Sequence, residues 1–167
     1  MGSDKTILGA AGEYYVMHRL LRRGMIAALA PAGVPDADII VTDRLGHRLC
    51  AIQVKTRTEK GSDGGWHMKP KHEELSSPNL FYVFVDFGIA DSSAKCWVIP
   101  SAVVADALRT THQAWLAAPG KNGRPHKDSL VRRLVPHYKI LEARYPLGWL
   151  DQYHEAWQLL DAVAAQP

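Results

Sequence analysis

Residues 48–57 predict a β-strand, and within it residues 52–55 alternate between apolar and polar side chains. Residues two apart in a strand point to the same face, so Gln53 and Lys55 emerge side by side, while Ile52 and Val54 face the other way. An amide and an ammonium in the middle of a strand are costly to bury unless a polar or charged partner lies opposite them. The segment therefore predicts a neighbouring element that brings a charged group to this face.

Asp38 is the charged group that the sequence places best for this role. It opens an apolar run at residues 37–42, which predicts a second strand, and residues 43–47 form a hairpin-like connection to the first strand. Carboxylate, amide and strand carbonyl oxygens can then converge on one hard cation such as Mg²⁺, which keeps several waters and needs only two or three protein oxygens. We therefore predict Asp38 and Gln53 as metal ligands.

Lys55 and Glu13 would complete such a site. The Lys55 ammonium would lie near an attacking water or a phosphate, where it could stabilise negative charge or, with a lowered pKa, help to deprotonate water. Glu13 stands in line with Met17 and Leu20 on a largely apolar stripe of a helix predicted at residues 5–23. It could face the sheet and reach the same metal directly or through water.

These residues resemble the PD-(D/E)XK nuclease family, in which a helix glutamate precedes an aspartate with two aliphatic residues and a strand ending in (Glu/Gln)-x-Lys. The chain looks like the branch that contains archaeal junction resolvases and an intron homing endonuclease, which also uses Gln-x-Lys. The match spans roughly residues 7–57 and is carried by Gly12-Glu13, Pro35-Asp36-Ala37-Asp38-Ile39-Ile40 and Gln53-Val54-Lys55.

This resemblance implies an α/β fold of the restriction-endonuclease-like class, with an αβββαβ core and a central mixed sheet flanked by helices. It also implies hydrolysis of DNA phosphodiester bonds with Mg²⁺, for which Mn²⁺ can substitute. The implied catalytic residues are Glu13, Asp38, Gln53 and Lys55, of which the first three would hold the metal. A homodimer is expected as well, because a duplex or a branched DNA presents two strands.

Alternatives remain at this centre. Asp36 has the same parity as Asp38, so which of the two binds metal is open, and Asp38 is favoured because it directly precedes the aliphatic pair. Asp38 and Lys55 could instead form a structural ion pair while Gln53 bonds a neighbouring strand. Gln53 replaces the family's usual glutamate, so a catalytically weak or inactive nucleic-acid-binding module on the same fold is the competing function.

The chain length of 167 residues predicts one domain, with a core at roughly residues 5–108 and a helical extension at roughly 109–167. In that extension Trp149, Tyr153, Trp157 and Leu160 recur at helical spacing, which predicts a final helix at residues 147–165 with a core or dimer-facing stripe. Further elements are predicted as a short helix at 70–75, strands at 80–87 and 95–99, and a helix at 100–108.

Composition narrows the remaining classes of protein. No run of apolar residues is long enough for a membrane span, and the N-terminus has no signal pattern, so we expect a cytoplasmic protein without a membrane partner. Cys50 and Cys96 each lie in an apolar run and are expected to be buried free thiols. No small-molecule cofactor is expected. The net charge of +3 permits nucleic-acid binding without requiring it.

Basic and aromatic residues that follow the catalytic strand are candidates for contact with DNA. The stretch at residues 66–71 is predicted to be a flexible, substrate-contacting loop, because it comes soon after that strand. The candidates are Arg57, Trp66, Lys69 and Lys71. The competing interpretation for each of them is a solvated surface residue.

Overall fold

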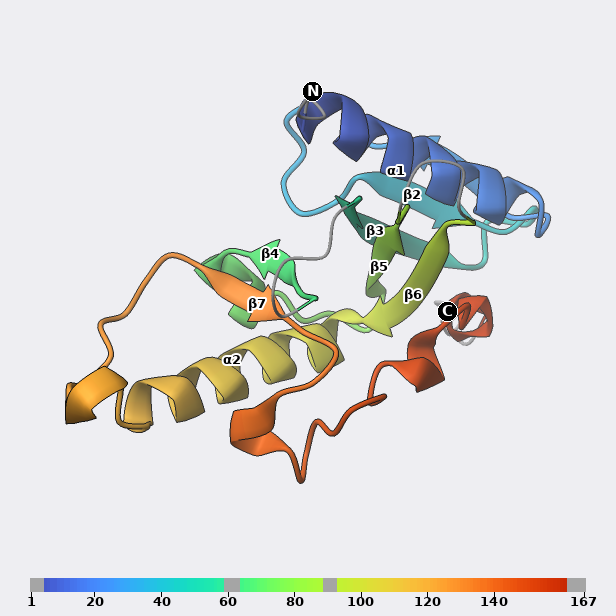
Figure 1. The fold of residues 1–167 in the computed structure, drawn as a ribbon. Helices are drawn as coiled ribbons and strands as arrows, with labels where there is room; N and C mark the ends of the chain where they lie inside the picture. The colour runs from blue at the N-terminus through green and yellow to red at the C-terminus, as the bar shows by residue number, and fades with distance from the viewer. Residues whose placement is uncertain (1–4, 59–63, 89–92, 162–167) are drawn as a thin grey trace.

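The computed structural model describes residues 5–58, 64–88 and 93–161, and it arranges them in three layers, with a mixed sheet between two helices (Figure 1). The sheet has the strand order β1-β2-β3-β5-β6. Its strands are β1 (Ile26–Leu29), β2 (Ile39–Thr42), β3 (Leu49–Arg57), β5 (Leu80–Asp86) and β6 (Lys95–Pro100). Neighbouring strands are antiparallel except β3 and β5, which are parallel.

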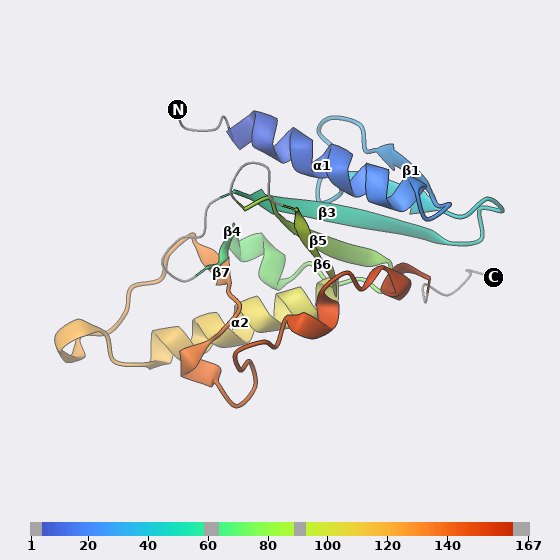
Figure 2. The same cartoon turned by 45° about the vertical axis from the view of Figure 1, so that its right-hand side comes forward.

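The helices α1 (Lys5–Leu21) and α2 (Ser101–Ala117) cover opposite faces of the sheet, as the side view in Figure 2 shows. In α1 the buried residues Gly12, Val16 and Leu20 recur every four positions, so one stripe of the helix packs on the sheet. Gly12 makes this contact close, because a Cβ at that position would lie 1.8 Å from the Thr56 Oγ1 of β3. The close approach fixes the neighbouring Glu13 beside β3.

Two hydrophobic cores lie on the two faces of the sheet. Strand β5 supplies both, since Phe81, Val83 and Val85 face α1 and Tyr82 and Phe84 face α2. The strand predicted at residues 80–87 is therefore confirmed as β5, and it is buried on both faces of the sheet. The two cysteines are free and buried, also as expected.

A small second sheet pairs β4 (Trp66–Met68) with β7 (Arg132–Leu134) in antiparallel register. We call this pair the β4·β7 ribbon. The chain runs from β3 through β4 and the 3-10 helix η1 (Pro70–Glu73) into the parallel strand β5. The short helix predicted at residues 70–75 is thus confirmed as η1, whereas residues 66–68, predicted as part of a flexible loop, form a strand.

The C-terminal third is not the helical extension that the sequence predicted. After α2 the described residues form β7 and the short 3-10 helices η2 (Lys121–Gly123), η3 (Lys139–Leu141), η4 (Asp151–Tyr153) and η5 (Trp157–Leu160). The final helix expected at residues 147–165 is wrong over its described part, and residues 162–165 lie outside the described residues.

The aromatic spacing that predicted this helix has another cause. Trp149 belongs to the core under α2, with Tyr153 packed against it, whereas Trp157 and Leu160 belong to the core under α1. The segment crosses from one face of the sheet to the other, and Glu155 between them has a φ of 54°, which interrupts any helix. The helical spacing therefore arises from residues that pack into two different cores and not from one helix. The prediction that these residues belong to the core is confirmed.

No helix in the described part of the chain combines the length and the apolar character that crossing a membrane requires.

Candidate active site

The candidate site lies where β3 loses one of its two neighbours. Strand β2 pairs with β3 only through Leu49–Ile52, whereas β5 accompanies β3 from Ala51 to Arg57. Beyond Ile52 the β2 side of β3 is therefore bordered by side chains instead of a strand.

Asp38 supplies the hydrogen bonds that a neighbouring strand would otherwise make to this part of β3. Its N–H donates to the Ile52 carbonyl at 2.8 Å, which aligns it with the end of the β2–β3 ladder. Its Oδ2 then accepts the Val54 N–H at 2.6 Å and the Gln53 Nε2 at 2.5 Å. No hydrogen bond to Asp38 Oδ1 forms among the described residues, and the Gln53 amide that donates through nitrogen keeps its Oε1 as an acceptor. Asp38 Oδ1 and Gln53 Oε1 therefore remain available as metal ligands.

Glu13 and Lys55 complete the predicted set. Burial raises the pKa of the Glu13 carboxyl, the Asp38 carboxylate raises it further, and the Lys55 ammonium opposes them. Burial lowers the pKa of Lys55, with Asp38 opposing this effect and two neighbouring lysines adding to it. The charges of Glu13, Asp38 and Lys55 therefore act on one another, and the structure brings together all four residues that the sequence predicted.

A cleft of about 650 Å³ opens along this part of β3. It is bounded by α1, by the second half of β3 and by the β4·β7 ribbon. Glu13 and Lys55 both line it, so two of the four predicted residues face a space large enough for a substrate.

Comparisons with known proteins agree with this architecture. No model of a known protein family and no curated protein matches the sequence. Among solved structures, the bacterial homing endonuclease I-Ssp6803I aligns over 98% of this chain and 95% of its own, with a TM-score of 0.56 and 19% identity. The chain has the restriction-endonuclease-like fold.

A Holliday junction resolvase from the archaeal hyperthermophile Archaeoglobus fulgidus aligns over 86% of this chain and 92% of its own, with a TM-score of 0.44 and 17% identity. Both of these proteins are nucleases. The predicted central mixed sheet flanked by helices is confirmed for the restriction-endonuclease-like core, although the crossover from β3 to β5 contains the short η1 and the long helix α2 follows β6.

Asp36 has a different role from Asp38 in this restriction-endonuclease-like core. It adopts a φ of 65°, and its carboxylate pairs with the Lys71 ammonium at 2.6 Å. A φ in this range is uncommon for a residue other than glycine. The ion pair connects the turn before β2 to η1, so Asp36 holds these two segments together while Asp38 bonds to β3.

His72 and Tyr82 form a buried pair that the sequence analysis missed. The His72 Nδ1 lies 2.8 Å from the Tyr82 hydroxyl, and Tyr82 is the register partner of Gln53 on β5. Burial lowers the pKa of His72 to about 4, and the nearby Lys55 ammonium adds to the shift. No local signal in the sequence links Tyr82, within the apolar run of β5, to a histidine in η1.

The predicted DNA contacts Arg57 and Trp66 are held inside the protein. Arg57 pairs with Asp86, with Nη2 2.8 Å from Oδ2, and its guanidinium carbon lies 3.6 Å from the centre of the Trp66 ring. Trp66 is 3% exposed and contacts Phe84 and Trp97 edge-on. Trp66 is therefore packed in the core, although it and Arg57 also border the cleft, and the DNA contact predicted for these two residues stays a prediction. Lys69 and Lys71 are exposed, and both act on the charge of Lys55.

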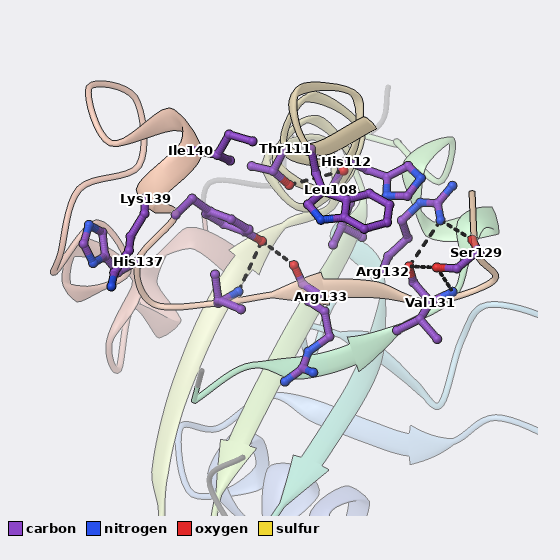
Figure 3. A pocket seen from close by; sticks show the side chains of 13 residues that line it. Leu108, Thr111, His112, Ser129, Val131, Arg132, Arg133, His137, Lys139 and Ile140 are labelled. Carbon is purple, nitrogen blue, oxygen red and sulfur yellow. Dashed lines mark hydrogen bonds between the residues drawn. The ribbon is translucent and has the colours of Figure 1, made fainter. Parts of the chain in front are cut away.

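A second hollow of about 430 Å³ lies between α2 and the segment around β7 (Figure 3), and Arg133 borders both this hollow and the cleft. Several of its charged groups are paired within the protein. Arg132 bonds Glu73, and the His112 Nε2 lies 2.7 Å from the Asp128 carboxylate. These contacts connect α2 and η1 to β7, which makes this hollow part of the scaffold.

The atoms of the candidate site that could bind a metal are oxygens. Among the described residues, no three His, Cys, Asp or Glu side chains gather in a metal-binding group. The donors at the end of β2 are two carboxylates and one amide, from Glu13, Asp38 and Gln53. This set fits a hard cation that retains much of its water, and it does not fit a tetrahedral zinc site.

Proposed function

We propose that this chain is a divalent-metal-dependent DNA endonuclease that acts on duplex or branched DNA as a homodimer. The observation that carries the proposal is the convergence of Glu13, Asp38, Gln53 and Lys55 at the open half of β3, beside a cleft. The structural neighbour I-Ssp6803I is a homing endonuclease, which supports the same reaction class.

The residues can share the work of phosphodiester hydrolysis. Asp38 Oδ1, Gln53 Oε1 and Glu13 would hold Mg²⁺ or Mn²⁺. When bound, such an ion lowers the pKa of a water and neutralises charge on a phosphate. Because Val54 N–H and Gln53 Nε2 both bond Asp38 Oδ2, the carboxylate is held in one orientation before substrate arrives.

Lys55 would act on the phosphate itself. Its ammonium reaches the cleft from the same face of β3 as Gln53, where it can donate to a phosphate oxygen and stabilise negative charge that develops during attack. Burial lowers its pKa, and the same partial loss of water strengthens its interaction with an anion. Lys69 and Lys71 would contact phosphates further along the backbone.

The test is cleavage of supercoiled plasmid and of a four-way DNA junction with Mg²⁺, with Mn²⁺ and with EDTA. We expect metal-dependent cutting by the wild type and a loss of about 100- to 1000-fold in Lys55→Ala. Lys139→Ala is the matched control, because it removes an exposed lysine from η3, away from the cleft.

A second candidate function is a nucleic-acid-binding module that does not cut. The neutral amide of Gln53 and the small number of carboxylates favour it. In the same experiment, a wild type that binds DNA but leaves both substrates intact with either metal would establish this function and reject the enzyme. A wild type that neither binds nor cuts would reject both.

A further inference from the structure

The β4·β7 ribbon has two chemically different faces. Trp66, Met68 and Leu134 turn toward the core under α2 and are buried. Side chains alternate along a strand, so the intervening residues turn the other way. These residues are His67 and Arg133, which are direct register partners in the ribbon. The face turned away from the core therefore carries an imidazole and a guanidinium side by side.

This face forms a wall of the catalytic cleft. His67 and Arg133 line the same cleft as Glu13 and Lys55. Figure 3 shows the Arg133 side chain extending from β7 toward β4, and Arg133 borders both the α2 hollow and the cleft. The ribbon is anchored to the core through Trp66 and Leu134, so it presents these two side chains from a fixed position.

The cleft is also unobstructed on its α1 side. Gly9 lines it, and a Cβ at this position would meet no atom within 4 Å. Glycine in a helix interior costs roughly 1 kcal/mol relative to alanine, and no packing contact in the structure requires it here. The bare backbone leaves the cleft wide between α1 and the ribbon.

We infer that Arg133, with His67 beside it, is a phosphate-binding element that holds a second, uncut phosphate of the DNA backbone at the ribbon wall of the cleft. A guanidinium matches the oxygens of a phosphate with two parallel N–H bonds, and phosphate contacts of this kind fix the position of DNA without reading its sequence. The contact would set the distance between the bound backbone and Lys55. This inference rests on the proposed nuclease function.

The experiment measures binding and cutting separately. Fluorescence anisotropy with a fluorescein-labelled DNA duplex in EDTA gives affinity without cleavage, and plasmid nicking with Mg²⁺ gives activity. The variants are Arg133→Gln, Arg133→Lys and His67→Asn. Arg22→Gln is the matched control, because this exposed arginine follows the end of α1 far from the cleft and its removal changes the net charge equally.

We expect Arg133→Gln to weaken binding by about tenfold and to lower the slope of log affinity against log salt by about one. His67→Asn, at an exposed position, should weaken binding by a smaller factor, and Arg133→Lys should retain most of the salt slope. Thermal melting of each variant shows whether the ribbon remains folded, and the exposed His67 position keeps the test valid if Arg133→Gln does not fold.

The outcomes separate the inference from the proposed function. If the wild type cuts DNA but the Arg133 and His67 variants bind as tightly as Arg22→Gln, the phosphate-binding element is wrong and the nuclease stands. If the wild type neither binds nor cuts, both are wrong. Weaker binding confined to the ribbon variants supports the inference.

Discussion

Both halves of β3 are extended strand, but the first half is packed among apolar residues and the second half carries the polar residues of the candidate site. Through Ile52 the strand has β2 on one side, and Ile52 itself is fully buried between β2 and β5. From Gln53 onward, β5 remains on one side and the Asp38 carboxylate accepts the free strand N–H on the other. The first half is stabilised by apolar packing, and the second half holds the polar residues of the candidate site.

The difference between the two halves of β3 shows how a small domain can accommodate charged side chains in its central sheet. Beyond the paired part of β2, side chains replace a strand, so Gln53 bonds the Asp38 carboxylate while Lys55 reaches the cleft, both from within the sheet. Buried polar groups are tolerated when their hydrogen bonds are made, and here Asp38 accepts two. Stability should depend mostly on the first half of β3, and activity on the second.

The largest stability effect should come from the apolar half. Ile52→Ala should lower the free energy of unfolding by about 2–5 kcal/mol, because it leaves a cavity in a fully buried position. Leu49→Ala in the same strand is the control, since that residue is 57% exposed and its loss should cost about 0.5 kcal/mol or less. Urea denaturation measures both, and equal losses would contradict the division of β3.

The contact of α1 with the polar half gives the next effect. Gly12→Ala should destabilise by about 1–3 kcal/mol, because its Cβ would collide with Thr56. Gly9→Ala is the same change on the same helix without a neighbour within 4 Å, and it should stabilise by up to about 1 kcal/mol.

A double variant tests the cause of the Gly12→Ala effect. Thr56 Oγ1 is buried without a hydrogen-bond partner in the described structure, so Thr56→Ala removes the obstacle without breaking a bond. Gly12→Ala with Thr56→Ala should recover much of the lost stability. No recovery in the double variant would mean that Thr56 does not set the helix position.

The buried His72 predicts a smaller, pH-dependent effect. Its pKa falls from 6.5 to about 4 on folding, so the unfolded chain binds the proton more tightly. Stability associated with His72 is complete above pH 6.5 and is lost as pH falls toward 4, by on the order of 1–2 kcal/mol at pH 5.

Thermal melting across this pH range measures the effect. His72→Gln should flatten the decline between pH 6.5 and 4 relative to the wild type. His47→Gln at an exposed position is the control and should leave the decline unchanged. A wild-type decline that persists in His72→Gln would assign it to other groups.

The sequence alone was sufficient to predict which site residues lie together when they are close in the chain. Asp38, Gln53 and Lys55 are linked by one hairpin and by the two-residue period of a strand, both of which can be read from neighbouring positions. Glu13 followed from its position on an apolar helix stripe, and the close contact at Gly12 explains why that stripe meets β3.

Relations between distant segments could not be read in the same way. Whether Trp66 is exposed or buried depends on its contacts with Arg57, Phe84 and Trp97. These residues lie far apart in the sequence, so the burial of Trp66 could not be predicted from its neighbours in the chain. The ribbon needs β7, a three-residue strand with no periodic signal of its own. The predicted C-terminal helix was wrong for a similar reason, because Trp149 and Trp157 are anchored in different cores.

We propose Asp38, at the open half of β3, as the metal-binding carboxylate of a hydrolytic site. Nicking of supercoiled plasmid with Mg²⁺ by Asp38→Asn and by Asp36→Asn tests it with two matched changes two residues apart. We expect Asp38→Asn to lose about 1000-fold or more of the rate and Asp36→Asn to stay within about tenfold of the wild type, because Asp36 pairs with Lys71. A severe loss in Asp36→Asn with near-normal nicking by Asp38→Asn would contradict the account.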